Sequence, residues 1–258
     1  MNDQELLALF DREMRIEIEY PDMTKEVLPH VTRFLRPAPG ANFILYSQLD
    51  DENAETVIAE QVEYLKQLNQ PFEWKVYDHD RPPDLTDRLA AKGLIVDEPD
   101  AVMILDLAST PASMLKEQNV EVRPIEDRSN LGDVVKVLEN VWDRSFEWAY
   151  ARLGAHLEIP GYLKIFVAYQ AEIPACTGWV YFHPHSQFAS LWGGSTIPEY
   201  RDQGLYTAVL AVRVKEAIRR GYRYMTIDAS SMSRPIVERH GFRLLTNAHA
   251  CEWKIASS

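Results

Sequence analysis

The first hundred residues alternate between helical and extended hydrophobic patterns. Apolar residues recur at four-residue steps between Asn2 and Glu19, which predicts an amphipathic helix, and Asn2 and Glu5 have the spacing of a capping box. A longer helix opens at Asp50, and a short one ends at Gly93. Short apolar runs predict strands at 43–49, 72–77 and 101–107. The last run is apolar enough to be buried on both faces of a sheet.

A second series of strands and helices follows a short linker at 109–113. We predict strands at 120–123, 162–169, 177–182, 188–197, 224–228 and 252–255, of which the second and third form a hairpin. Helices are expected from about residue 131, at 204–220 and at 234–240. Gly221 and Gly241 follow the last two helices, where a left-handed residue commonly ends a helix.

Two segments of the chain repeat one order of elements. A strand, a helix, a strand, a short helix, a glycine and a further strand begin at Phe43 and again at Phe188. The step from Phe43 to Gly93 is 50 positions, and that from Phe188 to Gly241 is 53. We interpret the segments as two copies of one supersecondary unit. The alternative is that strands and helices alternate independently, as they do in any α/β protein.

The charge is unevenly distributed and supports two domains. Residues 1–117 hold 11 Lys and Arg against 24 Asp and Glu, a net of −13, whereas residues 118–258 hold 16 against 15, a net of +1. Their sum is the chain's formal charge of −12. Such an acidic chain is a poor candidate for nucleic acid, whose phosphates require basic side chains. We therefore predict domains at 1–115 and 118–258.

Composition excludes several other classes of protein. No apolar stretch approaches the roughly 18 residues of a membrane span, and the first residues lack the features of a signal peptide. The two cysteines, Cys176 and Cys251, cannot form a disulfide framework and fit a reducing compartment, so we expect a cytoplasmic protein. The spacing of cysteines and histidines does not match a zinc site, and no metal is expected.

The clearest local motif lies between the strand at 188–197 and the following helix. Gly204 permits a tight turn, and the first amides of the helix have no partner within it. These amides, the helix dipole and the nearby Arg201 favour an anion such as pyrophosphate. We expect the cofactor-binding residues here, at Thr196, Ile197, Arg201, Asp202, Gln203, Gly204, Leu205, Tyr206 and Thr207. An ordinary turn with a surface arginine is the alternative.

Residues 118–258 resemble the GNAT superfamily of acyl-CoA-dependent N-acetyltransferases. The resemblance rests on Arg201-x-x-Gly204-x-Tyr206, on the preceding Ile197-Pro198-Glu199-Tyr200, and on Gly241-Phe242 after a short helix. It implies an α/β (α+β) fold of two tandem GNAT-like domains, each with a mixed, mostly antiparallel sheet flanked by helices. The first domain resembles the later half of the fold, but Leu49-Asp50-Asp51-Glu52 stands where phosphate would bind, so this domain is degenerate.

Two positions depart from the family's pattern. Tyr206 replaces a small residue of the motif, and Val237 stands where many members carry a tyrosine that protonates the leaving thiolate. Ser230 matches the position of the family's asparagine, and we expect it to bond the pantetheine or a bound water. The resemblance also implies that the two parallel strands around the cofactor separate, with Gly193-Gly194 allowing the distortion; a bend for packing alone is the alternative.

The catalytic base is less well marked. Glu147, Glu172 and His183 are the candidates, and Glu147 lies among aromatic residues that either line an acceptor pocket or belong to the core. We take Ser230 and Glu147 as the catalytic residues.

The expected activity is transfer of acetyl from acetyl-CoA, the cosubstrate, to a small-molecule or peptide amine. A non-catalytic acyl-CoA-binding or sensing protein is the main alternative, and a general nucleotide-binding domain is a weaker one. No nucleic acid or membrane partner is expected, and the sequence leaves the acceptor and the oligomeric state open.

Overall fold

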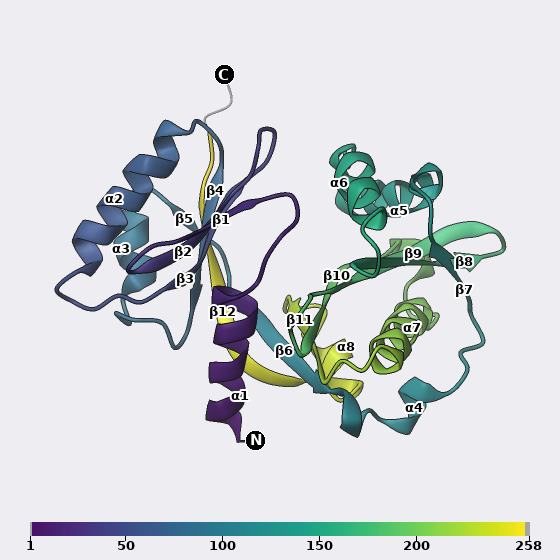
Figure 1. Ribbon diagram of the computed structural model, residues 1–258. Coiled ribbons are helices and arrows are strands. Elements are labelled where there is room, and N and C mark those ends of the chain that lie inside the picture. The colour runs from purple at the N-terminus through teal and green to yellow at the C-terminus, as the bar shows by residue number, and fades with distance from the viewer. Residues whose placement is uncertain (1, 256–258) are drawn as a thin grey trace. The chain divides into compact units, whose positions relative to one another are not determined.

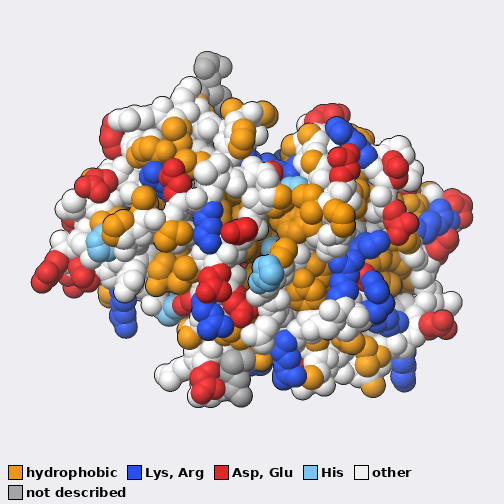
Figure 2. All heavy atoms as spheres, in the orientation of Figure 1, with side chains coloured by type: hydrophobic (Ala, Val, Ile, Leu, Met, Phe, Trp, Pro, Cys, Tyr) orange, Lys and Arg blue, Asp and Glu red, His pale blue; other side chains and the backbone are white. Residues whose placement is uncertain are grey.

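The computed structural model describes residues 2–255 and divides them into two compact units. The N-terminal unit comprises residues 2–103, 228–235 and 244–255, and the C-terminal unit comprises residues 104–227 and 236–243. Both combine a mixed sheet with helices, as the sequence predicts (Figure 1). On the face drawn in Figure 2, acidic side chains are spread over both units, and Lys and Arg side chains gather on part of the C-terminal unit.

The N-terminal unit orders its strands β1-β2-β3-β4-β12-β6, with the short β5 paired to β12. Only β3 and β4 run parallel among the neighbours β1 to β4. Helices α2 and α3 lie together on one face (Figure 1). The elements of this unit are α1 (Asp3–Phe10), β1 (Thr24–Val27), β2 (Val31–Leu35), β3 (Asn42–Ser47), α2 (Ala54–Gln67), β4 (Phe72–Tyr77), α3 (Leu85–Ala91), β5 (Ile95–Val96), β6 (Asp100–Asp106) and β12 (Arg243–Trp253).

Local sequence explains the first helices of this unit. The predicted capping box is present, because the Asn2 side chain accepts from the Glu5 amide and the Glu5 carboxylate accepts from the Asn2 amide. The helix then continues as a π-helical turn, Asp11–Ile16. In α2 the predicted apolar stripe is buried against β3 and β4 in a core that includes Ile44, Ile58 and Trp74. Leu68, its last predicted member, is the exception, because its side chain is 37% exposed.

The C-terminal unit orders its strands β6-β11-β10-β9-β8-β7. Among the neighbours β7 to β11, the pair β10–β11 is parallel and the other pairs are antiparallel. Helices α5 and α6 cover one face of the sheet and α7 covers the other (Figure 1). Its further elements are α4 (Ala112–Leu115), β7 (Glu121–Ile125), α5 (Gly132–Trp142), α6 (Trp148–Leu157), β8 (Leu163–Gln170), β9 (Ile173–Phe182), β10 (Phe188–Thr196), α7 (Leu205–Arg219), β11 (Tyr224–Ala229) and α8 (Arg234–Arg239).

The last strand differs most from the prediction. The sequence suggests a strand at 252–255, whereas β12 runs from Arg243 to Trp253. Its residues Ala248–Trp253 pair antiparallel with Tyr77–Phe72 of β4, so the end of the chain completes the N-terminal unit. Periodicity misses most of this strand because its polar residues, such as Thr246 and His249, interrupt the apolar run. The domains at 1–115 and 118–258, which the charge distribution suggests, stay a prediction.

Further elements were not predicted from the sequence. Strands β1, β2 and β5 and helix α6 are absent from the predicted series. The segment 109–113, predicted as a linker, ends in the short helix α4. In contrast, the repeated order of elements is confirmed: β3, α2, β4 and α3 follow one another as β10, α7, β11 and α8 do.

Candidate functional site

The parallel strands β10 and β11 separate within the C-terminal unit. They pair only at Phe188↔Tyr224, Ala189↔Met225 and Ser190↔Thr226. Strand β10 continues to Thr196, and beyond Ser190 its pairing is with β9 alone. Two parallel strands that stop pairing expose backbone amides and carbonyls along the opening, which is where a ligand in extended conformation can bind.

A bulge in β10 lies at this opening. The register between β10 and β9 shifts between Trp192 and Ser195, and Gly193 adopts a φ of +61°. A side chain at Gly193 is impossible without movement, because a Cβ there would lie 1.8 Å from the Trp179 ring. The distortion predicted for Gly193-Gly194 is therefore present, and it turns the backbone at the end of the paired region.

The turn between β10 and α7 presents a row of backbone N–H groups. Asp202 has a φ of +60° and Gly204 a φ of +80°, and Gly204 precedes the first residue of α7. Within residues 2–255, the first amide of this helix with a backbone acceptor is that of Ala208, which donates to Gly204. The amides from Asp202 to Thr207 have no protein acceptor in that range. Free amides at a helix N-terminus favour an anion, and the space beside Gly204 is open, since a Cβ there would contact nothing within 4 Å.

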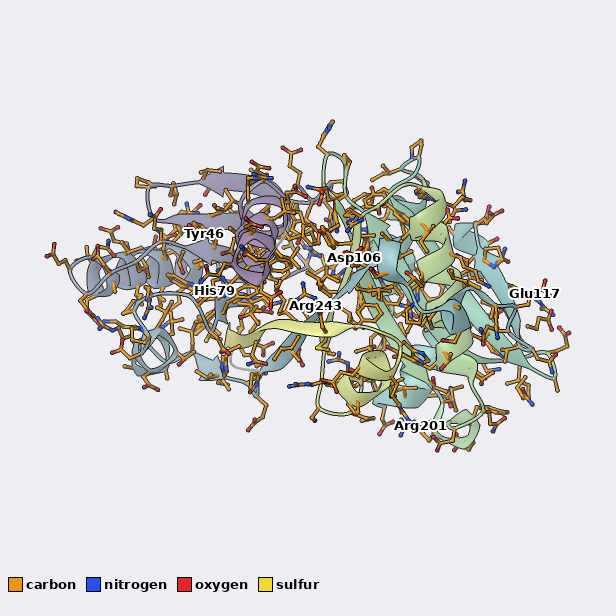
Figure 3. The ribbon with its side chains drawn as sticks, turned by 90° about the horizontal axis from the view of Figure 1, so that it is seen from below. Tyr46, His79, Asp106, Glu117, Arg201 and Arg243 are labelled. Atoms are coloured by element: carbon orange, nitrogen blue, oxygen red, sulfur yellow. The ribbon has the colours of Figure 1, made fainter. Side chains whose placement is uncertain are left out.

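The predicted cofactor residues surround this turn. The Arg201 side chain is exposed at the edge of the unit (Figure 3), and its Nε donates to the Thr196 carbonyl over 3.3 Å. Gln203 bonds the Glu199 carbonyl, whereas Ile197 and Leu205 are buried and anchor the two ends of the turn. The assignment of these residues to a cofactor stays a prediction.

One polar contact here escaped the sequence analysis. The Thr207 hydroxyl, on the first turn of α7, lies 3.0 Å from Nε2 of His240, at the end of α8. Burial, and then the charge of Arg239, lower the pKa of His240. The contact links the first turn of α7 to the segment that carries the Gly241-Phe242 signature.

Tyr206, the unusual residue of the motif, packs under the bulge. A Cβ at Gly194 would lie 2.9 Å from the Tyr206 ring, so the missing side chain at Gly194 leaves room for this ring. Burial raises the pKa of the Tyr206 hydroxyl, which interacts with Arg213 of the same helix. The pair of Gly194 and Tyr206 explains how the motif accepts an aromatic ring.

Arg213 is a buried cation that the sequence analysis missed. Its side chain is fully buried, and its Nε donates to the Val209 carbonyl. Nη1 approaches the carbonyls of Trp179 and Trp192 at 3.4 and 3.5 Å, the second of which lies at the start of the bulge. No carboxylate pairs with it among residues 2–255, and burial lowers its pKa. Only its place in a long helix, with apolar residues around it, gives a signal in the sequence.

The three candidate bases lie in different surroundings. Glu147 is exposed just before α6, and its carboxylate forms no ion pair among the described residues. Glu172 is exposed in the β8–β9 turn and accepts two hydrogen bonds from Arg123, at 2.8 and 2.9 Å. His183 is 3% exposed, and burial lowers its pKa to about 4. Because the Glu172 carboxylate is already paired with Arg123, Glu172 is the least suitable of the three candidates for the catalytic base.

Aromatic and hydroxyl groups gather near His183 on the face of the sheet under α5 and α6. The Ser190 hydroxyl lies 2.8 Å from His183 Nε2 and accepts from the Trp192 indole over 2.9 Å. Thr226, opposite Ser190 in the last parallel pair, is buried with an unpartnered hydroxyl. Of the aromatics near Glu147, Phe146 is buried in the core, whereas Trp142 and Trp148 are 56% and 40% exposed.

The positions matched to the family's tyrosine and asparagine, Val237 and Ser230, differ in burial. Val237 on α8 is completely buried and offers no proton. Ser230 is exposed and groups with the N-terminal unit, and its hydroxyl lies 3.3 Å from that of Ser233. It also lies 3.4 Å from the Ser233 amide, as in a turn that leads into a helix. The catalytic roles of Ser230 and Glu147 stay predictions.

The corresponding turn of the N-terminal unit is closed by its own carboxylate. Between β3 and α2, Asp50 Oδ1 accepts from the amides of Glu52 and Asn53, both at 2.9 Å. These amides stand where the turn before α7 in the C-terminal unit has free N–H groups. An external anion would therefore have to displace the Asp50 side chain.

The separation of β3 and β4 is filled as well. These strands pair in parallel only from Asn42↔Phe72 to Ile44↔Trp74. The fully buried Arg15, from the π-helical turn, donates through Nε to the Leu45 carbonyl over 2.9 Å. Its guanidinium also donates to both Asp80 oxygens, at 2.8 and 2.7 Å, and stacks 3.9 Å from the centre of the Tyr77 ring.

Within residues 2–255, no group of three or more His, Cys, Asp or Glu side chains is arranged to hold a metal ion. Over the same residues, no helix has both the length and the apolar character needed to cross a membrane.

Comparison with known proteins places this architecture. No protein-family model matches the chain, and no curated protein sequence matches it. Solved structures do. A GCN5-related N-acetyltransferase from Kribbella flavida aligns over 98% of this chain and 95% of its own, with a TM-score of 0.68 and 11% identity.

Two further structures agree. A tandem GNAT protein from the clavulanic acid biosynthesis pathway aligns over 94% of this chain and 86% of its own, with a TM-score of 0.62 and 12% identity. A GCN5-related N-acetyltransferase from Sphaerobacter thermophilus aligns over 88% of this chain and 81% of its own, with a TM-score of 0.60 and 12% identity.

The chain has the GNAT fold. The expected fold class is therefore confirmed, and the GNAT resemblance of the sequence has a structural basis. At 11–12% identity the likeness concerns the fold, so the chemistry must be argued from the residues of this chain.

Proposed function

We propose that this protein is an N-acetyltransferase that moves an acetyl group from acetyl-CoA to an amine. The observation that carries the proposal is the row of free amides from Asp202 to Thr207 beside the separated strands β10 and β11. The amides suit a pyrophosphate, and the separated strands suit the extended pantetheine arm that follows it. The GNAT fold supports the same cosubstrate.

The bulge of β10 supplies the electrostatic part of the reaction. Attack of an amine on a thioester places negative charge on the carbonyl oxygen, and fixed backbone amides stabilise that charge. The turned backbone at Gly193 and Gly194 provides such amides next to the opening. Arg213, which approaches the Trp192 carbonyl, holds the start of the bulge in place.

Proton transfer is the less defined part. The amine must lose a proton, and Glu147 is the exposed carboxylate that we assign to this step. The thiolate leaves without a tyrosine, because Val237 occupies that position. Since a thiol has a pKa of about 8.5, solvent can supply its proton near neutral pH. Ser230 would then act by positioning the pantetheine or a water.

A non-catalytic acyl-CoA-binding protein is the second candidate. It is favoured by the buried Val237 and by the absence of an unambiguous base. It predicts the same binding as the enzyme but no turnover.

An acceptor screen separates the two functions. Acetyl-CoA should raise the melting temperature, because a ligand of the native state shifts unfolding by mass action. Thiol release is then followed with a panel of small-molecule and peptide amines, with the amine-free reaction as control. Amine-dependent release supports the enzyme, and stabilisation without release from any amine supports the binding protein. An unchanged melting temperature at millimolar acetyl-CoA would contradict both.

A further inference from the structure

The N-terminal unit contains a cavity of its own, beside the residues that lead into the blocked anion turn. Its volume is about 180 Å³. It lies where β3 ends and beyond the end of β4, and Tyr46 and His79 mark it in Figure 3. The lining residues are Asp11, Tyr46, Ser47, Gln48, Leu49, His79, Asp80 and Arg81. In sheets with parallel strands, ligands bind beyond the carboxyl ends of those strands, so the place itself favours a binding site.

One wall of the cavity is rigid and charged. Asp80 is held by Arg15 and by the Tyr77 amide, so its oxygens are occupied. Asp11 accepts from Arg15 over 2.8 Å and lies 2.9 Å from His79 Nε2. Its side chain is still 20% exposed. Burial raises the pKa of Asp11, but the hydrogen bonds and charges of His79 and Arg15 outweigh this effect, and the net pKa is lowered. Asp11 is therefore ionised, and it keeps a lone pair that can accept from a ligand donor.

Further polar groups of the lining make no hydrogen bond or ion pair through their side chains among residues 2–255. Ser47 belongs to the lining of the cavity, and its buried hydroxyl has no hydrogen-bond partner among residues 2–255. A buried hydroxyl without a partner is unfavourable, and a rotation of this short side chain toward the cavity would let a ligand group satisfy it. Arg81 forms no ion pair among residues 2–255, and the Tyr46 hydroxyl has no hydrogen bond there.

The charges of the lining select the ligand. Asp11 offers an acceptor for a cation, and Arg81 with Ser47 offers donors for an anion. With Arg15 behind the wall, the two carboxylates and the two guanidinium groups cancel, so a ligand with a net charge has no advantage over one that carries both signs. We infer that this cavity binds a small zwitterion of the amino-acid class, with its ammonium at Asp11 and its carboxylate at Arg81 and Ser47.

Three probes test the inference directly on the full chain. L-alanine carries both charged groups, propionate lacks the ammonium, and ethylamine lacks the carboxylate. Isothermal titration calorimetry should show L-alanine binding with a dissociation constant in the millimolar range or below, as suits a ligand of about six heavy atoms. Propionate and ethylamine should bind at least about tenfold more weakly, because each loses one charge-assisted contact.

Two variants locate the site. Ser47→Ala removes a hydroxyl that has no partner, so the melting temperature should stay unchanged while L-alanine binding weakens about fivefold or more. Arg81→Gln should weaken it about tenfold or more. Arg88→Gln is the matched control, since Arg88 belongs to the same unit but pairs with Asp51 and Asp84 outside the cavity. This control should bind L-alanine as the wild type does.

The outcomes are decisive in each direction. No heat from L-alanine up to about 50 mM would overturn the inference, as would equal binding of propionate or ethylamine, which would indicate a plain anion or cation site. Unchanged L-alanine affinity in both Ser47→Ala and Arg81→Gln would place the binding elsewhere. None of these results depends on acetyl-CoA, so they leave the proposed acetyltransferase function unaffected.

Discussion

The two units contain the same pair of separating parallel strands and treat it in opposite ways. Between β10 and β11 the following turn leaves six successive amides free, and a glycine bulge opens the strand. Between β3 and β4 the turn binds its own Asp50, and Arg15 fills the space between the strands. One fold thus gives one open site and one closed site, and a few side chains decide which.

The buried arginines sharpen the contrast. Arg15 and Arg213 are both fully buried. Arg15 is paired with Asp80 and Asp11, whereas Arg213 contacts only backbone carbonyls and Tyr206. In the N-terminal unit, the ion pairs of Arg15 hold neighbouring parts of the buried interior together. In the C-terminal unit, Arg213 has no ion pair and lies under the bulge.

Removing Arg15 should produce the largest loss. Arg15→Met leaves Asp80 buried without its counter-ion, which typically costs about 3–5 kcal/mol of unfolding free energy. Arg213→Met leaves no carboxylate behind and should change stability by no more than about 1 kcal/mol. Urea unfolding of both variants makes the measurement. A larger loss in Arg213→Met than in Arg15→Met would contradict our account of the two arginines.

Acid should weaken the C-terminal unit through His183. Its pKa of about 4 in the folded chain lies below the unfolded value of about 6.5, so the unfolded chain binds the extra proton between these values. The stability associated with neutral His183 is complete above pH 6.5 and falls as the pH drops toward 4, by on the order of 3 kcal/mol.

Matched variants isolate this contribution. His183→Gln should show a shallower loss of stability between pH 6.5 and 4 than the wild type. His185→Asn, at an exposed position with a positive φ that asparagine tolerates, should keep the full slope. Equal slopes in all three proteins would remove His183 from the explanation.

The anion turn can be closed by imitating the N-terminal unit. Gly204→Asp places a carboxylate before the free amides, and we expect acetyl-CoA binding to weaken at least about a hundredfold, or roughly 2.7 kcal/mol. Gly204→Asn carries the same shape without charge and should lose less. Asp51→Ala, in the corresponding turn of the N-terminal unit, should bind as the wild type does. Normal affinity in Gly204→Asp would move the phosphate site elsewhere.

The smallest effect concerns Ser230. If it positions the cosubstrate, Ser230→Ala should lower thiol release about tenfold, the equivalent of about one hydrogen bond. Val237→Tyr should not be needed for turnover. A thousandfold loss in Ser230→Ala would instead make this serine an essential proton donor. Turnover that appears only in Val237→Tyr would favour the non-catalytic protein.

Much of this comparison is accessible from the sequence. Periodicity and the glycines at 204, 221 and 241 predict the repeated strand–helix order, because these signals are local. Clustered carboxylates at 50–52 predict that the first turn rejects phosphate, and the structure adds the reason, since Asp50 already occupies the amides.

The rest depends on contacts between distant residues. No local pattern indicates that Arg15 reaches Asp80, or that the end of the chain pairs with β4, because each requires the folded sheet to bring the partners together. The sequence does not show that the Tyr206 ring packs against Gly194, for the same reason. Sequence patterns do not predict which side chains occupy a space in the folded chain. In this protein, the side chains of Arg15 and Asp50 make the difference between the closed site and the open one.

The most direct test of the central claim is the stoichiometry of acetyl-CoA binding, measured by isothermal titration calorimetry on the full chain. Our account predicts one molecule per chain for the wild type and none detectable for Gly204→Asp at the same concentrations. Two molecules per chain, or one that remains in Gly204→Asp, would show that the N-terminal unit is not closed or that the C-terminal turn is not the site.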